Sequence, residues 1–82
     1  MERTGIFVGS FDPFTIGHAS VVRRALPLFD RLVIGVGVNA GKRYMSSTED
    51  RVAAISRQYA DDSRVTVEAY TGLTVDFAER HG

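Results

Sequence analysis

The sequence predicts an α/β fold in which three parallel strands alternate with three helices, as one half of a doubly wound sheet. Two observations support this class. Short apolar runs rich in β-branched residues recur at positions 6–8, 32–38 and 65–69. The segments between them are long enough for right-handed crossover connections. We therefore expect residues 1–82 to be the N-terminal part of a single domain with the order βαβαβα.

The composition is that of a globular protein, with 44% hydrophobic and 24% charged residues. Ten basic residues balance ten acidic ones, so no basic field would attract a nucleic acid. The absence of cysteine excludes disulfides, thiolate metal sites and cysteine nucleophiles. No apolar run approaches the roughly 20 residues of a membrane span. Without a signal-peptide pattern either, we expect no membrane association and a cytoplasmic protein.

The first strand and helix are predicted from residues 6–29. Residues 6–8 suit a strand buried on both faces, and the turn formers of residues 9–17 predict a loop. Helical spacing of apolar residues begins after His18. Pro27 lacks a backbone N–H and crowds the preceding turn, so we expect this helix to end or kink near Leu26.

The second strand and helix follow the same logic. Residues 32–38 predict a central parallel strand, and residues 39–43 a loop. Ser47 is placed as the N-cap of the next helix, with Asp50 in the position of a capping-box acid. The inner face of that helix is predicted to comprise Val52, Ala53, Ile55, Ser56 and Tyr59.

The third strand is predicted nearer the sheet edge, because Val65, Val67 and Ala69 alternate with polar residues. Thr74 is expected to cap a last short helix that continues through Phe77 and Ala78.

Two glycine patterns resemble nucleotide-binding motifs without their context. The letters Gly-x-Gly-x-x-Ala at residues 35–40 match a dinucleotide fingerprint, but they begin inside a strand and lead into a loop. We interpret Gly35 and Gly37 as glycines required for close packing. The segment 37–42 is one residue short of a phosphate loop, and Arg43 replaces its Ser/Thr, which excludes a Walker-type NTPase.

The strongest functional signal is the segment 9–18, Gly-Ser-Phe-Asp-Pro-Phe-Thr-Ile-Gly-His. It joins the first strand to the first helix, where a doubly wound fold binds phosphate groups. Gly9 and Gly17 allow the backbone to approach a ligand closely, and Ser10 offers a hydroxyl at the end of the strand. His18 on the first helical turn would present its imidazole to a phosphate.

This segment resembles the T/H-x-G-H signature of the nucleotidyltransferases with a Rossmann-like fold. Thr15, three residues before His18, is similar to the residue found in the phosphopantetheine adenylyltransferase family. Residues 39–42, Asn-Ala-Gly-Lys, resemble the loop that carries that family's substrate-binding lysine. Residues 71–78, Thr-Gly-Leu-Thr-Val-Asp-Phe-Ala, resemble its pantetheine-side segment. The resemblance covers essentially the whole chain.

The resemblance implies adenylyl transfer from ATP to 4′-phosphopantetheine, giving dephospho-coenzyme A and pyrophosphate in coenzyme A biosynthesis. His18 and Lys42 would be catalytic, His18 toward the α-phosphate and Lys42 on the acceptor phosphate. Ser10 would contact both phosphates beside the N–H of Phe11, and Leu73 and Thr74 would contact the pantetheine arm. Mg²⁺ would arrive on the ATP phosphates, with no metal ligand from the protein. Homo-oligomers, hexamers in the family, are implied as well.

The family's downstream arginine-bearing and serine-rich segments, which contact ATP, are absent from these 82 residues. Their absence favours one alternative, a ligand-binding half-domain that is not catalytic. Two more alternatives stay open: another T/H-x-G-H nucleotidyltransferase, and a purely structural fragment. In the strand order 3-2-1-4-5 the first strand would lack its neighbour, the fourth. From that open edge we expect the isolated chain to self-associate or to require further protein.

Overall fold

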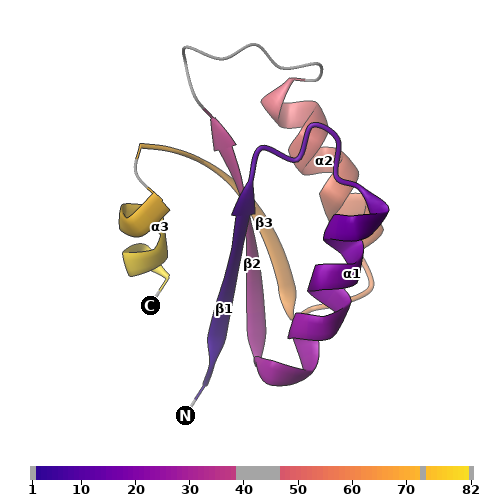
Figure 1. The fold of residues 1–82 in the computed structure, drawn as a ribbon, viewed down its shortest axis with the longest axis vertical. Helices are drawn as coiled ribbons and strands as arrows, with labels where there is room; N and C mark the ends of the chain where they lie inside the picture. The colour runs from indigo at the N-terminus through magenta and orange to yellow at the C-terminus, as the bar shows by residue number, and fades with distance from the viewer. Residues whose placement is uncertain (1, 39–46, 73, 82) are drawn as a thin grey trace.

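The computed structural model describes residues 2–38, 47–72 and 74–81. Strands and helices alternate along the chain, with one 3₁₀ turn directly after the first helix (Figure 1). Their bounds are β1 Thr4–Gly9, α1 Ile16–Ala25, η1 Leu26–Leu28, β2 Arg31–Val38, α2 Thr48–Gln58, β3 Val65–Thr71 and α3 Thr74–Arg80. The predicted α/β class and element order are confirmed.

The three strands form a parallel sheet in the order β1-β2-β3. Gly9 pairs with Val36, and Val38 pairs with Thr71, so the carboxyl ends of all three strands lie at one edge of the sheet. Helices α1 and α2 cover one face of the sheet and α3 covers the other (Figure 1). This is the doubly wound arrangement that the sequence predicts.

The sheet separates two apolar clusters, because successive residues of a strand point to opposite faces. On the α1/α2 face the buried residues are Phe11, Val22, Leu32, Ile34, Val36 and Ile55. On the α3 face they are Val33, Tyr70 and Phe77. Since β2 contributes buried residues to both clusters, it is the central strand that the sequence predicts.

The ends of the helices follow local signals. Helix α1 begins at Ile16, two residues before the predicted start at His18, because Thr15 acts as its N-cap. Pro27 ends it as predicted: α1 stops at Ala25 and the chain continues as the turn η1. Ser47 caps α2 as predicted, with its hydroxyl accepting the backbone N–H of Asp50 at 3.1 Å.

Three local predictions are wrong. The apolar residues of β1 are half-buried rather than buried on both faces, because β1 lies at the edge of the described sheet. On α2, Ala53 and Ser56 are exposed, whereas Arg51 is buried. Thr74 is the first residue of α3 rather than its cap, and its hydroxyl lies 3.0 Å from that of Tyr70.

Gly35 is required for packing, as predicted. A methyl group added there would lie 2.6 Å from the Phe77 ring and 3.1 Å from the Tyr70 ring. The closeness of this approach explains why β2 carries a glycine at its centre. Gly35 therefore reflects the packing of α3 on the sheet, whereas the neighbours of Gly37 are Tyr70 of β3 and Gly9 of β1.

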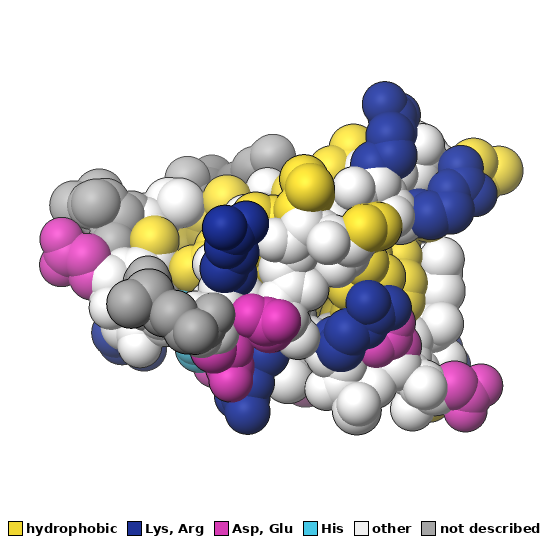
Figure 2. All heavy atoms as spheres, turned by 90° about the horizontal axis from the view of Figure 1, so that it is seen from below, with side chains coloured by type: hydrophobic (Ala, Val, Ile, Leu, Met, Phe, Trp, Pro, Cys, Tyr) yellow, Lys and Arg dark blue, Asp and Glu magenta, His cyan; other side chains and the backbone are white. Residues whose placement is uncertain are grey.

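Charges are mixed over the surface. Seen from the end where the strands begin, arginine and acidic side chains are interspersed and do not gather into one basic patch (Figure 2). None of the helices in the described part of the chain is long and apolar enough to cross a membrane.

Candidate functional site

The candidate site lies at the edge where the three strands end. Gly9, Val38 and Thr71 are the last residues of β1, β2 and β3. Gly37 of β2 lies close to groups from both neighbouring strands. A methyl group added there would lie 3.3 Å from the Tyr70 hydroxyl of β3 and 3.7 Å from the Gly9 carbonyl oxygen of β1. The first motif and the segment around Tyr70 therefore approach each other across Gly37.

The loop from Ser10 to Thr15 is held by a cluster of aromatic rings. Phe11 is buried, with 3% of its surface exposed, and its backbone adopts a positive φ of 50°. Its ring centroid lies 5.2 Å from those of Phe7 and Phe14. The ring also lies 3.1 Å from where a side chain at Gly9 would begin. Gly9 therefore makes room for the Phe11 ring, and the loop turns sharply at this point.

His18 stands on the first turn of α1 and is fixed by a reciprocal capping box with Thr15. The Thr15 backbone N–H donates to Nδ1 of His18 at 2.9 Å, and the Thr15 hydroxyl accepts the backbone N–H of His18 at 3.3 Å. A ring nitrogen that accepts a hydrogen bond does not carry the proton, so the neutral ring is protonated on Nε2. Nε2–H is thus the donor available to a ligand.

The half-buried His18 ring also packs against the aromatic cluster. Its centroid lies 5.0 Å from that of Phe11, edge to face, and 5.4 Å from that of Phe14. The sequence predicts one site for Ser10, Phe11 and His18, and the structure brings Phe11 and His18 into direct contact. The capping box was missed, although a threonine three residues before a possible acceptor is its usual signal.

Arg51 is the residue of this site that sequence analysis missed. Its guanidinium is buried beneath the loop and donates from Nη1 to the backbone carbonyl of Ser10 at 2.6 Å. It also donates from Nη2 to the hydroxyl of Thr48 at 3.2 Å. Arg51 precedes the buried Ile55 by four residues, and this spacing places both on one face of α2. That spacing was the signal available in the sequence.

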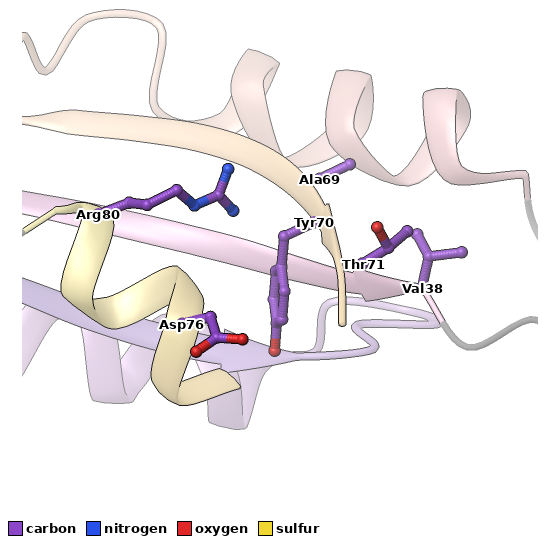
Figure 3. Close-up of a pocket in the computed structure, with 6 residues that line it drawn as sticks. All are labelled: Val38, Ala69, Tyr70, Thr71, Asp76 and Arg80. Atoms are coloured by element: carbon purple, nitrogen blue, oxygen red, sulfur yellow. The ribbon is translucent and has the colours of Figure 1, made fainter. Parts of the chain in front are cut away.

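On the α3 face, a cavity of about 350 Å³ opens between the ends of β2 and β3 and helix α3 (Figure 3). Its lining includes Val38, Ala69, Tyr70, Thr71, Asp76 and Arg80. Thr74 lies next to this cavity, because its hydroxyl contacts the hydroxyl of the lining residue Tyr70. The cavity offers the carboxylate of Asp76, the guanidinium of Arg80, the hydroxyls of Tyr70 and Thr71, and apolar surface.

A second cavity, of about 560 Å³, lies at the opposite end of the sheet, between residues such as Thr4, Arg31 and His81. This cavity is larger than the one beside α3. However, ligands of open α/β sheets bind at the carboxyl ends of the strands, so we place the candidate site at that end of the sheet. The predicted site residues Lys42 and Leu73 lie outside the described residues.

Magnesium is the metal ion that the resemblance implies for this site. Among the residues that the structure describes, no three His, Asp or Glu side chains converge on one point. Mg²⁺ keeps several waters and commonly reaches proteins on substrate phosphates with few protein ligands. The donor set is therefore compatible with magnesium that arrives as part of a nucleotide substrate.

Residues 6–82 match the cytidylyltransferase-like family. A phosphopantetheine adenylyltransferase of Christiangramia forsetii is 48% identical over 94% of this chain and 51% of its own length. One of Phocaeicola vulgatus is 57% identical over 93% of this chain and 50% of its own length. The chain spans about half the length of the curated relatives it matches. These relatives confirm the resemblance found in the sequence.

Among solved structures, the chain is similar to a bifunctional NMN adenylyltransferase/ADP ribose pyrophosphatase from Francisella tularensis. The match has a TM-score of 0.75 at 22% identity and covers 96% of this chain and 25% of that one. It supports the Rossmann-like fold.

Proposed function

Because this chain belongs to the cytidylyltransferase-like family, we propose that it forms the acceptor side of an active site that transfers the adenylyl group of ATP to 4′-phosphopantetheine. The products are dephospho-coenzyme A and pyrophosphate. The observation that carries the proposal is the capping box of Thr15 and His18, which leaves Nε2–H as a donor beside a strand end. The names of the relatives supply the substrates.

The reaction needs no protein nucleophile. An oxygen of the acceptor phosphate forms a bond to the α-phosphorus of ATP, the bond from that phosphorus to the bridging oxygen of the β-phosphate breaks, and pyrophosphate leaves with the electron pair. The protein's part is to position the two phosphates and to donate hydrogen bonds to the charge that develops. Mg²⁺ enters bound to the ATP phosphates.

Each residue of the first motif has a role in this scheme. Nε2–H of His18 donates to the α-phosphate in the transition state. The hydroxyl of Ser10 and the backbone N–H of Phe11 donate to phosphate oxygens. Lys42 pairs with the acceptor phosphate as a point charge. Leu73 and Thr74 contact the pantetheine arm, and the cavity between Tyr70 and Asp76 supports that role for Thr74.

The proposal includes a cytoplasmic homo-oligomer, a hexamer as the resemblance implies, with neither nucleic acid nor membrane as a partner. Support for association comes from α1 and η1, where Ile16, Val21 and Leu28 are exposed apolar residues. Val21 and Leu28 line one shallow hollow, and exposed apolar surface of this kind favours burial against another subunit.

The direct test is an adenylyl-transfer assay on the complete protein, with pyrophosphate release as the readout. Phosphopantetheine should be turned over well in excess of nicotinamide mononucleotide or a small phospho-alcohol. Preference for another acceptor would favour a different nucleotidyltransferase. Ligand binding without turnover would favour the non-catalytic binding protein.

A second test separates the two substrates. Lys42→Ala should weaken binding of phosphopantetheine, measured by calorimetry, well beyond any effect on ATP. Arg57→Ala, which removes an exposed cation from α2, is the matched control and should change neither. Equal losses for both ligands in Lys42→Ala would contradict the assignment of Lys42 to the acceptor phosphate.

A further inference from the structure

Arg51 occupies a position that is unfavourable for a cation. It lies in the fourth helical position of α2, near the positive end of the helix dipole. Arg51 has 4% of its surface exposed, and no other charged residue that the structure describes is buried. A buried guanidinium keeps its charge, so it is tolerated only where its N–H groups find acceptors. Arg51 finds one of them, the Ser10 carbonyl, 41 residues earlier in the chain.

The hydrogen bond to the Ser10 carbonyl oxygen also fixes the direction of the next backbone N–H, that of Phe11. Among the described residues the cis peptide bond is Asp12–Pro13, so the bond between Ser10 and Phe11 is trans. In a planar trans peptide, the C=O of one residue and the N–H of the next point in opposite directions. With the Ser10 carbonyl held by Arg51, the N–H of Phe11 points away from α2.

Phe11 needs such support, because a residue with a side chain seldom adopts a φ of +50°. A backbone conformation of this kind persists where the surroundings hold it from several directions. The buried Phe11 ring anchors one side of the turn, through its contacts with Phe7, Phe14 and His18. The Arg51 guanidinium anchors the other side.

We propose that Arg51 is a positioning residue that sets the orientation of the Ser10–Phe11 peptide, so that the Phe11 N–H meets the substrate phosphate. It acts through the backbone and does not touch substrate. The inference rests on the proposed function for the identity of the phosphate, but its geometric part concerns any phosphate bound by this loop. Because Arg51 lies in the first turn of α2, it also couples the placement of that helix to the phosphate loop.

The test compares Arg51→Met with Arg57→Met in the complete protein. Both changes remove one guanidinium from α2, but Arg57 is exposed. Arg51→Met should lower kcat by about 10²-fold, the scale expected when reacting groups are misplaced by about 1 Å. Arg57→Met should leave kcat unchanged. A kcat for folded Arg51→Met within twofold of wild type would overturn the inference.

The response of the Phe11 amide resonance to phosphate distinguishes a positioning role of Arg51 from a purely structural one. In ¹⁵N-labelled wild type, inorganic phosphate should shift the Phe11 amide resonance, and Arg51→Met should abolish that shift at temperatures where it stays folded. If Arg51 only supports the fold, its variant will melt earlier but retain the shift. A wild-type Phe11 amide that does not respond to phosphate also overturns the inference.

Arg51→Lys covers the case in which Arg51→Met does not fold. It keeps the charge but loses the planar fork that reaches Ser10 and Thr48 together. We expect it to fold, with kcat between those of Arg51→Met and wild type and a weakened Phe11 response. Full recovery of both would show that charge alone suffices and would overturn the positioning role. Should wild type prove inactive in adenylyl transfer, the proposed function fails, while the Phe11 response still decides the role of Arg51.

Discussion

The two faces of the sheet use their aromatic residues differently. On the α1/α2 face, the rings of Phe11 and His18 are in contact, and hydrogen bonds hold polar groups beside them. Thr15 donates to His18, and Arg51 donates to the Ser10 carbonyl. On the α3 face, Tyr70 stacks on Phe77 at 4.4 Å over a strand that carries Gly35. The buried groups of the first face therefore fix the direction of donors, whereas the buried core of the second packs α3 onto the sheet. We expect substitutions in the first set to change activity and substitutions in the buried core of the second to change stability.

The largest expected effect is on the first face. His18→Ala removes the Nε2–H donor and should lower kcat by about 10²–10⁴-fold, comparable to loss of an oxyanion donor. The chain's other histidine, His81, provides the control. It pairs with Glu68 at 3.0 Å at the far end of the sheet, so His81→Ala should leave kcat near the wild-type value. A His18→Ala enzyme with more than half the wild-type kcat would refute the role of His18.

The next effect is on the second face. Gly35→Ala places a methyl group 2.6 Å from the Phe77 ring, so the stacked pair must shift. We expect a loss of about 1–3 kcal/mol in the free energy of unfolding, the usual scale of overpacking. Denaturant unfolding of the complete protein measures it.

The comparison with Gly17 sharpens this prediction. A methyl group at Gly17 would meet only the Thr15 hydroxyl, at 3.5 Å, an ordinary contact. Because Gly17 lies in α1, Gly17→Ala should stabilise the protein by up to about 1 kcal/mol. Equal destabilisation by the two substitutions would show that packing against Phe77 does not limit position 35.

A smaller effect is expected at the helix cap. Thr15→Ala removes the hydroxyl that accepts the His18 backbone N–H and should cost about 1 kcal/mol of unfolding free energy. Activity should fall as well, because the first turn carries His18. Thr15→Ser keeps the hydroxyl and should restore both. Loss of stability without any loss of activity would show that the hydrogen bond at the cap does not position His18 for catalysis.

The smallest effect lies on neither face, at the surface turn before β3. The side chain of Arg64 donates to Asp62 at 3.0 and 2.9 Å, and these hydrogen bonds lower the pKa of Asp62 below its ordinary 3.8. A carboxyl whose pKa is lower in the folded state adds stability above its unfolded pKa and loses it as the pH falls through the folded value. Asp62→Asn should therefore lower Tm slightly at neutral pH.

The same substitution should leave Tm unchanged in acid, where wild-type Asp62 is itself protonated. Thermal melts at neutral pH and well below pH 3.8 check both halves of this prediction. A Tm difference that persists undiminished in acid would mean that the pairing with Arg64 is not its cause.

Much of the fold could be predicted because its signals lie between near neighbours in the chain. The run of β-branched residues in β2, the break at Pro27 and the cap at Ser47 each depend on a few adjacent residues. The predictions failed where burial depended on distant elements. Arg51 sits inward and Ala53 outward because α2 packs over the loop after β1.

The candidate site divides in the same way. By itself, the sequence determined that Ser10 and Phe11 follow a strand and that His18 lies in the first turn of the next helix, since strand, loop and helix are consecutive. Only the tertiary structure decided which way their donors point. The tautomer of His18 depends on a hydrogen bond formed once α1 has begun at Ile16. The direction of the Phe11 N–H depends on a carbonyl held by an arginine 41 residues away. Periodicity contains no information about such a contact, because the free energy that holds it arises only when the two elements pack together.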